Sequence, residues 1–238
     1  MILLHGGNGA PSGVTTLVQA LSAHAQVWSP AMQGHAGRVL PASLSVQGMA
    51  EDLLRQMDER RCERSFIGGY SFGAYVALYL ARHYPDRFLG VWTLAVKVVF
   101  DAPAVAHLMH LTSPERLDKP GHPFVDEIKQ RHLPQDWRAV MLLNQGLFRS
   151  LGVAAPLMAA DWSAMRVPAL VISGDADPLV PLQETHRLGA WLRCPVVLFP
   201  GSAHPLAAVP IQAVAREIGR WMDQSVVQPD ERAAQALD

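Results

Sequence analysis

The sequence has little of what marks secreted, membrane-spanning or metal-bound proteins. Cysteine occurs only twice, as Cys62 and Cys194, and no metal-ligand spacing joins the two. We read both as free thiols of a reducing compartment. The first five residues carry no charge, and no apolar run approaches the roughly 18 residues of a transmembrane helix. We therefore expect a cytoplasmic protein that does not associate with a membrane.

Charge is scarce as well. Only 17% of the residues are charged and the formal net charge is −1, so the chain offers no basic field for nucleic acid. Hydrophobic residues make up 50% of the 238 residues, which excludes disorder and suffices for the core of one large domain. The near-zero net charge favours a small, mostly neutral substrate. We expect no cofactor and no metal, and a monomer or a homodimer.

Short apolar runs alternate along the chain with longer amphipathic ones. The short runs predict six strands, over residues 2–4, 26–28, 65–70, 89–96, 168–173 and 195–199. The longer runs predict helices over residues 12–23, 46–60, 72–83 and 210–222. Alternation of this kind is typical of an α/β fold, with a mainly parallel sheet of about six strands flanked by helices.

One long segment interrupts this alternation. Residues 100–163 contain helical patterns near 102–111, 123–130 and 135–151, and none is followed by a convincing strand. We expect a helical lid inserted after the fourth strand; the alternative is one more strand–helix unit. The predicted core is then formed by residues 1–99 and 164–223, and residues 224–238 form a polar C-terminal tail.

The strongest chemical signal is the run Gly69-Tyr70-Ser71-Phe72-Gly73, which lies between an apolar strand and an apolar helix. A serine on such a turn adopts a strained backbone, and small residues on either side let strand and helix approach. Its oxygen then projects from the sheet edge near the positive end of the helix. The alternative is a serine at an ordinary helix N-terminus.

A serine nucleophile needs a base within hydrogen-bond reach. Of ten histidines, His204 follows the last strand and therefore lies at the edge where Ser71 emerges. The acid that orients this base comes from the loop after the preceding strand, where we favour Asp177 over Asp175, a turn residue, with Asp101 third. Four lid histidines are weaker pocket candidates: His107, His110, His122 and His132.

The order Ser71, Asp177, His204, together with His5-Gly6-Gly7 after the first strand, resembles the α/β-hydrolases. The likeness covers residues 1 to 222 and points to the compact, lid-bearing group of small esterases, C–C bond hydrolases and lactonases. It implies an oxyanion hole formed by the backbone N–H groups of Phe72 and Gly7, to which Asn8 could add a side-chain donor. A glycine loop that merely turns the chain is the alternative.

The sequence departs from that family in two places. Many relatives begin with two further strands, so we expect either a minimal member or a shortened chain. Many also carry an acid before the turn that follows the second strand, where this chain has Gln33-Gly34-His35-Ala36-Gly37. We expect that loop to be structural and activity to be unaffected.

The resemblance predicts a serine hydrolase that cleaves a small, largely apolar carboxylic ester, thioester or lactone through an acyl-enzyme. The alternatives are a C–C bond hydrolase or lyase with the same triad, and a non-catalytic ligand-binding homologue. A phosphate-binding interpretation of residues 5–9 is weaker, because no lysine accompanies the glycines. The candidate substrate contacts are His5, Asn8, Tyr70, Met109, Leu143, Leu147 and Phe148, with Leu108 and Leu142 as further pocket-facing residues.

Overall fold

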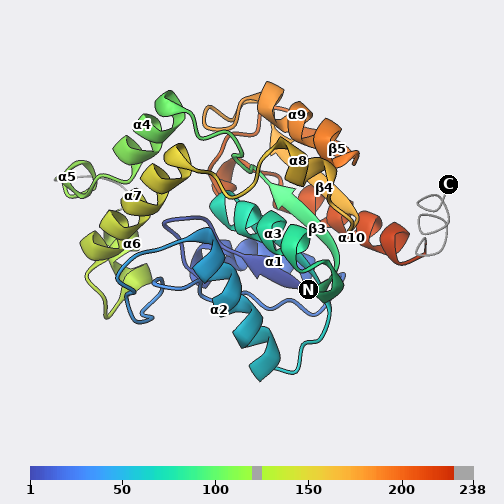
Figure 1. The fold of residues 1–238 in the computed structure, drawn as a ribbon, viewed down its shortest axis with the longest axis horizontal. Coiled ribbons are helices and arrows are strands. Elements are labelled where there is room, and N and C mark those ends of the chain that lie inside the picture. The colour runs from blue at the N-terminus through green and yellow to red at the C-terminus, as the bar shows by residue number, and fades with distance from the viewer. Residues whose placement is uncertain (120–124, 228–238) are drawn as a thin grey trace.

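The computed structural model describes residues 1–119 and 125–227 (Figure 1). Its centre is a parallel sheet of five strands in the spatial order β1-β2-β3-β4-β5. The strands are β1 (Ile2–Leu4), β2 (Ser65–Tyr70), β3 (Phe88–Leu94), β4 (Ala169–Gly174) and β5 (Val196–Phe199). Every residue of β4 and all but the last of β2 are buried, as expected for parallel strands covered on both faces.

The second predicted strand, over residues 26–28, is reduced to one isolated bridge between Trp28 and Ile2. Two hydrogen bonds hold it: Leu3 N–H donates to the Trp28 carbonyl, and Trp28 N–H donates to the Met1 carbonyl, each at 2.9 Å. Pro30 lacks the N–H that a longer ladder would require, so pairing stops there. The sheet therefore has five strands rather than six, and the inserted helices follow the third strand rather than the fourth.

Helices cover both faces of the sheet. One face packs against α1 (Thr15–Leu21), preceded by the 3-10 turn η1 (Pro11–Val14), and against α10 (Ile211–Val227). The other face packs against α2 (Val46–Glu59), α3 (Phe72–His83) and α9 (Leu182–Leu192). Helix α10 extends through residue 227, into the predicted tail, and residues 228–238 lie outside the described part of the chain.

Side chains of successive strand residues enter opposite layers, as the period of two requires. Phe66 and Trp92 lie in the layer with α1 and α10, while Ile67 and Val91 pack in the layer with α2 and α3. Trp92 is fully buried, and a Cβ on Gly68 would lie 2.0 Å from its ring. Gly68 therefore makes room for the indole in the neighbouring strand.

Between β3 and β4, the described residues 95–119 and 125–168 form five helices: α4 (Ala102–Leu111), α5 (Pro114–Leu117), α6 (Val125–His132), α7 (Trp137–Val153) and α8 (Ala159–Ser163). Helices α4, α6 and α7 gather on one side of the molecule, away from α10 (Figure 1). Helices α5, α6 and α7 form a small hydrophobic cluster of their own, with Leu117, Ile128, Trp137, Val140 and Met141. The predicted helix at 123–130 begins at residue 125 in the described chain; residues 120–124 lie outside it.

Within residues 1–119 and 125–227, no helix is both long enough and apolar enough to cross a bilayer. Both cysteines, Cys62 and Cys194, are free and partly buried. Burial raises the pKa of the Cys194 thiol to about 12, which makes it an inert packing residue rather than a nucleophile.

Candidate active site

Ser71 occupies the turn between β2 and α3 with φ 55° and ψ −123°, a conformation that non-glycine residues rarely adopt. The turn is held from both sides. Ser71 N–H donates to the Leu94 carbonyl of β3 at 2.8 Å. A Cβ on Gly69 would lie 2.4 Å from the carbonyl carbon of Gly73, and one on Gly73 would lie 2.3 Å from the His5 oxygen. Both glycines are therefore required for the close approach that the sequence indicates.

Ser71, His204 and Asp177 form a continuous hydrogen-bond chain. Ser71 Oγ lies 3.0 Å from His204 Nε2, and His204 Nδ1 lies 2.7 Å from Asp177 Oδ2. A carboxylate can only accept, so Nδ1 carries the imidazole hydrogen and Nε2 is free to accept from the serine hydroxyl. This is the arrangement in which a histidine can act as a general base.

Asp177 is held rigidly, whereas the other two acidic candidates are used elsewhere. The side chain of Asp177 has no exposed surface, and its second oxygen accepts from the N–H groups of Leu179 at 2.8 Å and Val180 at 3.1 Å. Asp175 accepts instead from Gly201 N–H at 2.6 Å and braces the turn after β5. Asp101 caps α4 by accepting from the Ala104 N–H at 2.9 Å.

The loop that carries His204 is tied to the nucleophile turn by Tyr70. The Tyr70 hydroxyl donates to the His204 carbonyl at 2.8 Å, and the two rings lie 5.4 Å apart between centroids. Burial raises the pKa of Tyr70, so the phenol remains a donor at neutral pH. The residue directly before the serine therefore fixes the loop of the base.

The loop after β1 lies against this turn. His5 is fully buried, and its Nε2 accepts from Met32 N–H at 3.1 Å, which leaves the hydrogen on Nδ1. That hydrogen is donated to the Gly6 carbonyl at 2.9 Å, where Gly9 N–H also donates at 3.0 Å. Burial, and then the nearby His35, lower the pKa of His5 to about 3, so the ring is neutral.

Fixing the Gly6 carbonyl fixes the direction of the Gly7 N–H, because the two groups point oppositely across a trans peptide. Gly7 lies beside Phe72: a Cβ on Gly7 would be 3.3 Å from the Cβ of Phe72. As the first residue of α3, Phe72 has a backbone N–H without a partner inside its helix. Gly7 and Phe72 thus lie side by side at the turn that carries Ser71.

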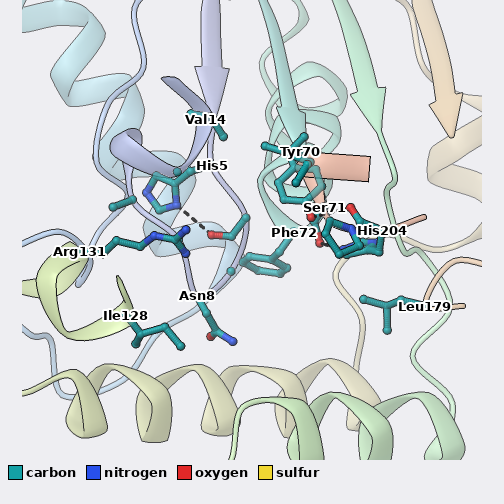
Figure 2. Close-up of a pocket in the computed structure, with 18 of the residues that line it drawn as sticks. His5, Asn8, Val14, Tyr70, Ser71, Phe72, Ile128, Arg131, Leu179 and His204 are labelled. Carbon is teal, nitrogen blue, oxygen red and sulfur yellow. Dashed lines mark hydrogen bonds between the residues drawn. The ribbon is translucent and has the colours of Figure 1, made fainter. Parts of the chain in front are cut away.

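Ser71 and His204 line a cavity of about 1210 Å³ (Figure 2). Part of its wall is apolar and comes from the body and the inserted helices: Phe100, Leu108, Leu111, Ile128, Phe148 and Leu179. Another part carries hydroxyl and amide groups from η1, α1 and α10: Ser12, Thr15, Thr16, Gln19 and Gln212. The Arg131 guanidinium also lies in the wall, packed over Gly13 and paired with Glu127.

Only some of the predicted substrate contacts line the cavity. His5, Asn8, Tyr70 and Phe148 line the cavity. Met109, Leu143 and Leu147 do not occur among the described lining residues, because their helices turn the neighbouring side chains Leu108 and Phe148 inward instead. Leu147 is 1% exposed and belongs to the hydrophobic core, and Leu142 is 55% exposed on the outer surface of α7.

Several lining residues escaped the sequence reasoning. Leu111 lies one helical turn after Leu108, so the helical period of α4 could have found it. Ile128 and Arg131 lie one turn apart on α6, and Ile128 lies one turn before His132, so the pocket candidate His132 could have led to Ile128. Of the histidines expected in the inserted segment, His132 is buried, His107 and His110 are exposed, and His122 lies outside the described residues.

Comparison with known proteins gives consistent results. Residues 1–217 match the sequence profile of the "Alpha/beta hydrolase family". The chain is 28% identical over 197 residues to a thermostable monoacylglycerol lipase from Bacillus sp. (strain H-257), covering 76% of this chain and 71% of that protein.

Solved structures share the fold at lower identity. A thermophilic esterase from Thermogutta terrifontis superposes with a TM-score of 0.76 at 21% identity, over 94% of this chain and 89% of the other. A 2-hydroxy-6-oxo-6-phenylhexa-2,4-dienoate hydrolase from Rhodococcus sp. strain RHA1 superposes with a TM-score of 0.73 at 22% identity, over 93% and 89%. These likenesses confirm the predicted α/β-hydrolase fold.

Proposed function

Because the chain belongs to the alpha/beta hydrolase family, we propose that it is a serine hydrolase that cleaves a small, largely apolar carboxylic ester through an acyl-enzyme on Ser71. The observation that carries this proposal is the chain of hydrogen bonds from Asp177 through His204 to Ser71, at 2.7 and 3.0 Å, which ends in the wall of a large cavity. The Bacillus lipase and the Thermogutta esterase both act on esters by name, which supports an ester as substrate.

In the first half of the reaction, Ser71 Oγ attacks the ester carbonyl carbon while His204 Nε2 takes the hydroxyl proton. The carbonyl oxygen becomes an oxyanion, which accepts hydrogen bonds from the N–H groups of Gly7 and Phe72. Asp177 stabilises the imidazolium without taking its proton. When the C–O bond to the alcohol breaks, His204 gives the proton to the leaving oxygen, and the acyl group stays on Ser71.

In the second half, a water molecule takes the place of the alcohol. His204 accepts a proton from this water as it attacks the acyl carbonyl, and the same two N–H groups hold the second oxyanion. Collapse breaks the bond to Ser71, whose oxygen recovers the proton from His204. The products are a carboxylic acid, an alcohol and the free enzyme.

The cavity and its wall favour an apolar acyl group longer than acetyl. Its volume of about 1210 Å³ exceeds what an acetyl group needs, and side chains such as Phe148 and Leu108 offer apolar contact. We also propose that the helices of residues 100–163 act as a lid, since α4, α6 and α7 contribute part of this wall. Substrate chain length would then be selected by the lid rather than by the sheet.

The test is turnover of p-nitrophenyl esters of short, medium and long acyl chain, with Ser71→Ala beside the wild type. We expect medium or long chains to be preferred, and Ser71→Ala to lose about 10⁴-fold or more in kcat. Ser163→Ala, at an exposed serine of α8, is the matched control and should keep full activity. Equal trace rates in wild type and Ser71→Ala would refute ester hydrolysis by this serine and favour a C–C substrate or a ligand-binding role.

A further inference from the structure

A buried polar cluster lies behind residues 5–9, which we call the candidate oxyanion loop. The cluster takes no part in the mechanism above. It consists of His35 from the loop after Trp28, His132 at the end of α6 and Asn144 in α7, and all three have no exposed surface. The ring centroids of His35 and His132 are 5.8 Å apart, and that of His5 is 5.4 Å from His35. Burying a polar group costs folding free energy unless the group is hydrogen-bonded, so the hydrogen-bond partners of these three side chains show what the cluster does.

His35 holds the carbonyl of Gly7. Its Nε2 lies 2.6 Å from the Gly7 oxygen, and its Nδ1 lies 2.9 Å from the Gln33 oxygen. Burial lowers the pKa of His35, so the ring is neutral and has one hydrogen to donate. A nitrogen lone pair facing an oxygen is more repulsive at the shorter distance, so Nε2 is the donor and Gly7 the acceptor.

This bond completes the orientation of Gly7. The peptide before Gly7 is fixed through the Gly6 carbonyl by His5 and Gly9, and the peptide after it is fixed through the Gly7 carbonyl by His35. Glycine has the widest choice of φ and ψ, so the direction of its N–H depends on such external bonds. Without His35, one of the two peptides that flank Gly7 would be free to rotate.

The same cluster joins this loop to the inserted helices. Asn144 Nδ2 lies 3.1 Å from His35 Nε2; because Nε2 carries the ring hydrogen, the amide must be turned so that Oδ1, which has no other partner among the described residues, faces Nε2 as a second acceptor. His132 Nε2 donates to the Asn8 carbonyl at 3.3 Å. His132 Nδ1 accepts from Ala36 N–H at 3.4 Å, and the Gln135 side chain accepts from Gly37 N–H at 3.2 Å. Residues 34–37 therefore lie between the candidate oxyanion loop and helices α6 and α7.

We propose that His35 is a positioning residue for the oxyanion hole. It sets the direction of the Gly7 N–H and couples that direction to the position of α6 and α7. This inference rests on the proposed function. It gives a role in catalysis to a loop that the sequence led us to consider only structural. His35 acts through Gly7 and touches no substrate, since it does not occur among the described residues that line the cavity.

The test compares His35→Gln with His35→Leu. A glutamine can place an amide N–H near the position of His Nε2, whereas leucine fills similar space without a donor. We expect kcat of His35→Leu to fall about 10- to 100-fold, less than the loss of a whole oxyanion donor, with KM little changed. His35→Gln should recover most of kcat. Affinity for a boronic acid, which mimics the tetrahedral intermediate, should fall in parallel with kcat.

The matched control is Leu188→Ala, a fully buried core residue of α9 outside the site. It measures what loss of stability alone does to kcat. If Leu188→Ala lowers kcat as much as His35→Leu at equal loss of melting temperature, the positioning role is overturned. It is overturned as well if His35→Gln is no better than His35→Leu although both variants fold.

The rate at which a fluorophosphonate labels Ser71 separates failure of this inference from failure of the proposed function. Labelling also places an oxygen in the oxyanion hole, so it should slow in His35→Leu and recover in His35→Gln. A wild type that is labelled but hydrolyses no ester would refute the proposed substrate, while the labelling rates still test His35. A wild type that is not labelled would overturn both.

Discussion

The two sides of the candidate active site are built in different ways. Ser71, Asp177 and His204 lie on short turns at the ends of β2, β4 and β5, each braced by backbone contacts such as those of Gly69 and Gly73. The facing wall, with Leu108 and Phe148, belongs to helices inserted between β3 and β4, and both side chains also pack into the main hydrophobic core. Turns between buried strands leave little freedom, whereas a segment inserted between two strands can vary without changing the order of the strands. Under the proposed function, the sheet edge would carry the reaction and the helices would select the substrate.

The largest effect that would test the sheet-edge side concerns the two aspartates after β4. Asp177→Asn should lower kcat by about 10³- to 10⁴-fold, because an amide at this place favours the wrong tautomer of His204. Asp175→Asn is its matched control: asparagine can still accept from Gly201 N–H, so most activity should remain. The measurement is kcat with the best p-nitrophenyl ester. The opposite ranking would show that the acid was assigned wrongly.

A smaller effect would sharpen the comparison on the helical side. Phe148→Leu should raise KM for long-chain esters about tenfold and shift the preferred chain length, because Phe148 lines the cavity beside Gly7 and Phe72. Its neighbour Leu147 is a core residue, so Leu147→Ala should cost about 2–5 kcal/mol in unfolding free energy. Chain-length preference should be unchanged in Leu147→Ala, and a shift there would return Leu147 to the substrate contacts.

The last expected effect is on stability rather than on activity: the protein should lose stability in acid, because neutral histidines are buried where the loop after β1 meets the inserted helices. Burial is the main cause that lowers the pKa of His5 to about 3 and of His132 to about 4, below the 6.5 of an unfolded histidine. Between these values the unfolded chain binds more protons than the folded one. Stability is therefore fully present above pH about 6.5 and falls as the pH drops toward about 3, by up to about 1.4 kcal/mol per pH unit for each histidine.

Urea unfolding at about pH 7 and about pH 5 measures this loss. His132→Gln should have a smaller difference between the two conditions than the wild type, although it is less stable at about pH 7. His107→Gln, at an exposed histidine of α4, controls for the removal of a histidine side chain. An unchanged pH difference in His132→Gln would mean that His132 is not buried as a neutral ring.

The sequence by itself determined the parallel α/β fold and the edge of the sheet at which the polar residues meet. The strong local pattern around Ser71 identified its turn, because a serine between an apolar strand and helix with close glycines has few structural solutions. His204 followed from topology alone, since the loops after parallel strands meet at one edge. The strand at residues 26–28 was overestimated, because three residues before a proline cannot indicate how far a ladder will extend.

Only the tertiary structure decided between side chains that share a loop or a helix. Asp175 and Asp177 have the same local pattern, and what separates them is the position of Gly201 and His204 in the loop after the next strand. Leu147 and Phe148 are adjacent residues of the same core cluster, and the packing of α7 gives Phe148 a place in the cavity wall as well. The contact of His35 with Gly7 joins residues 28 positions apart. Such choices depend on distances between segments remote in sequence, which no local pattern of residues encodes.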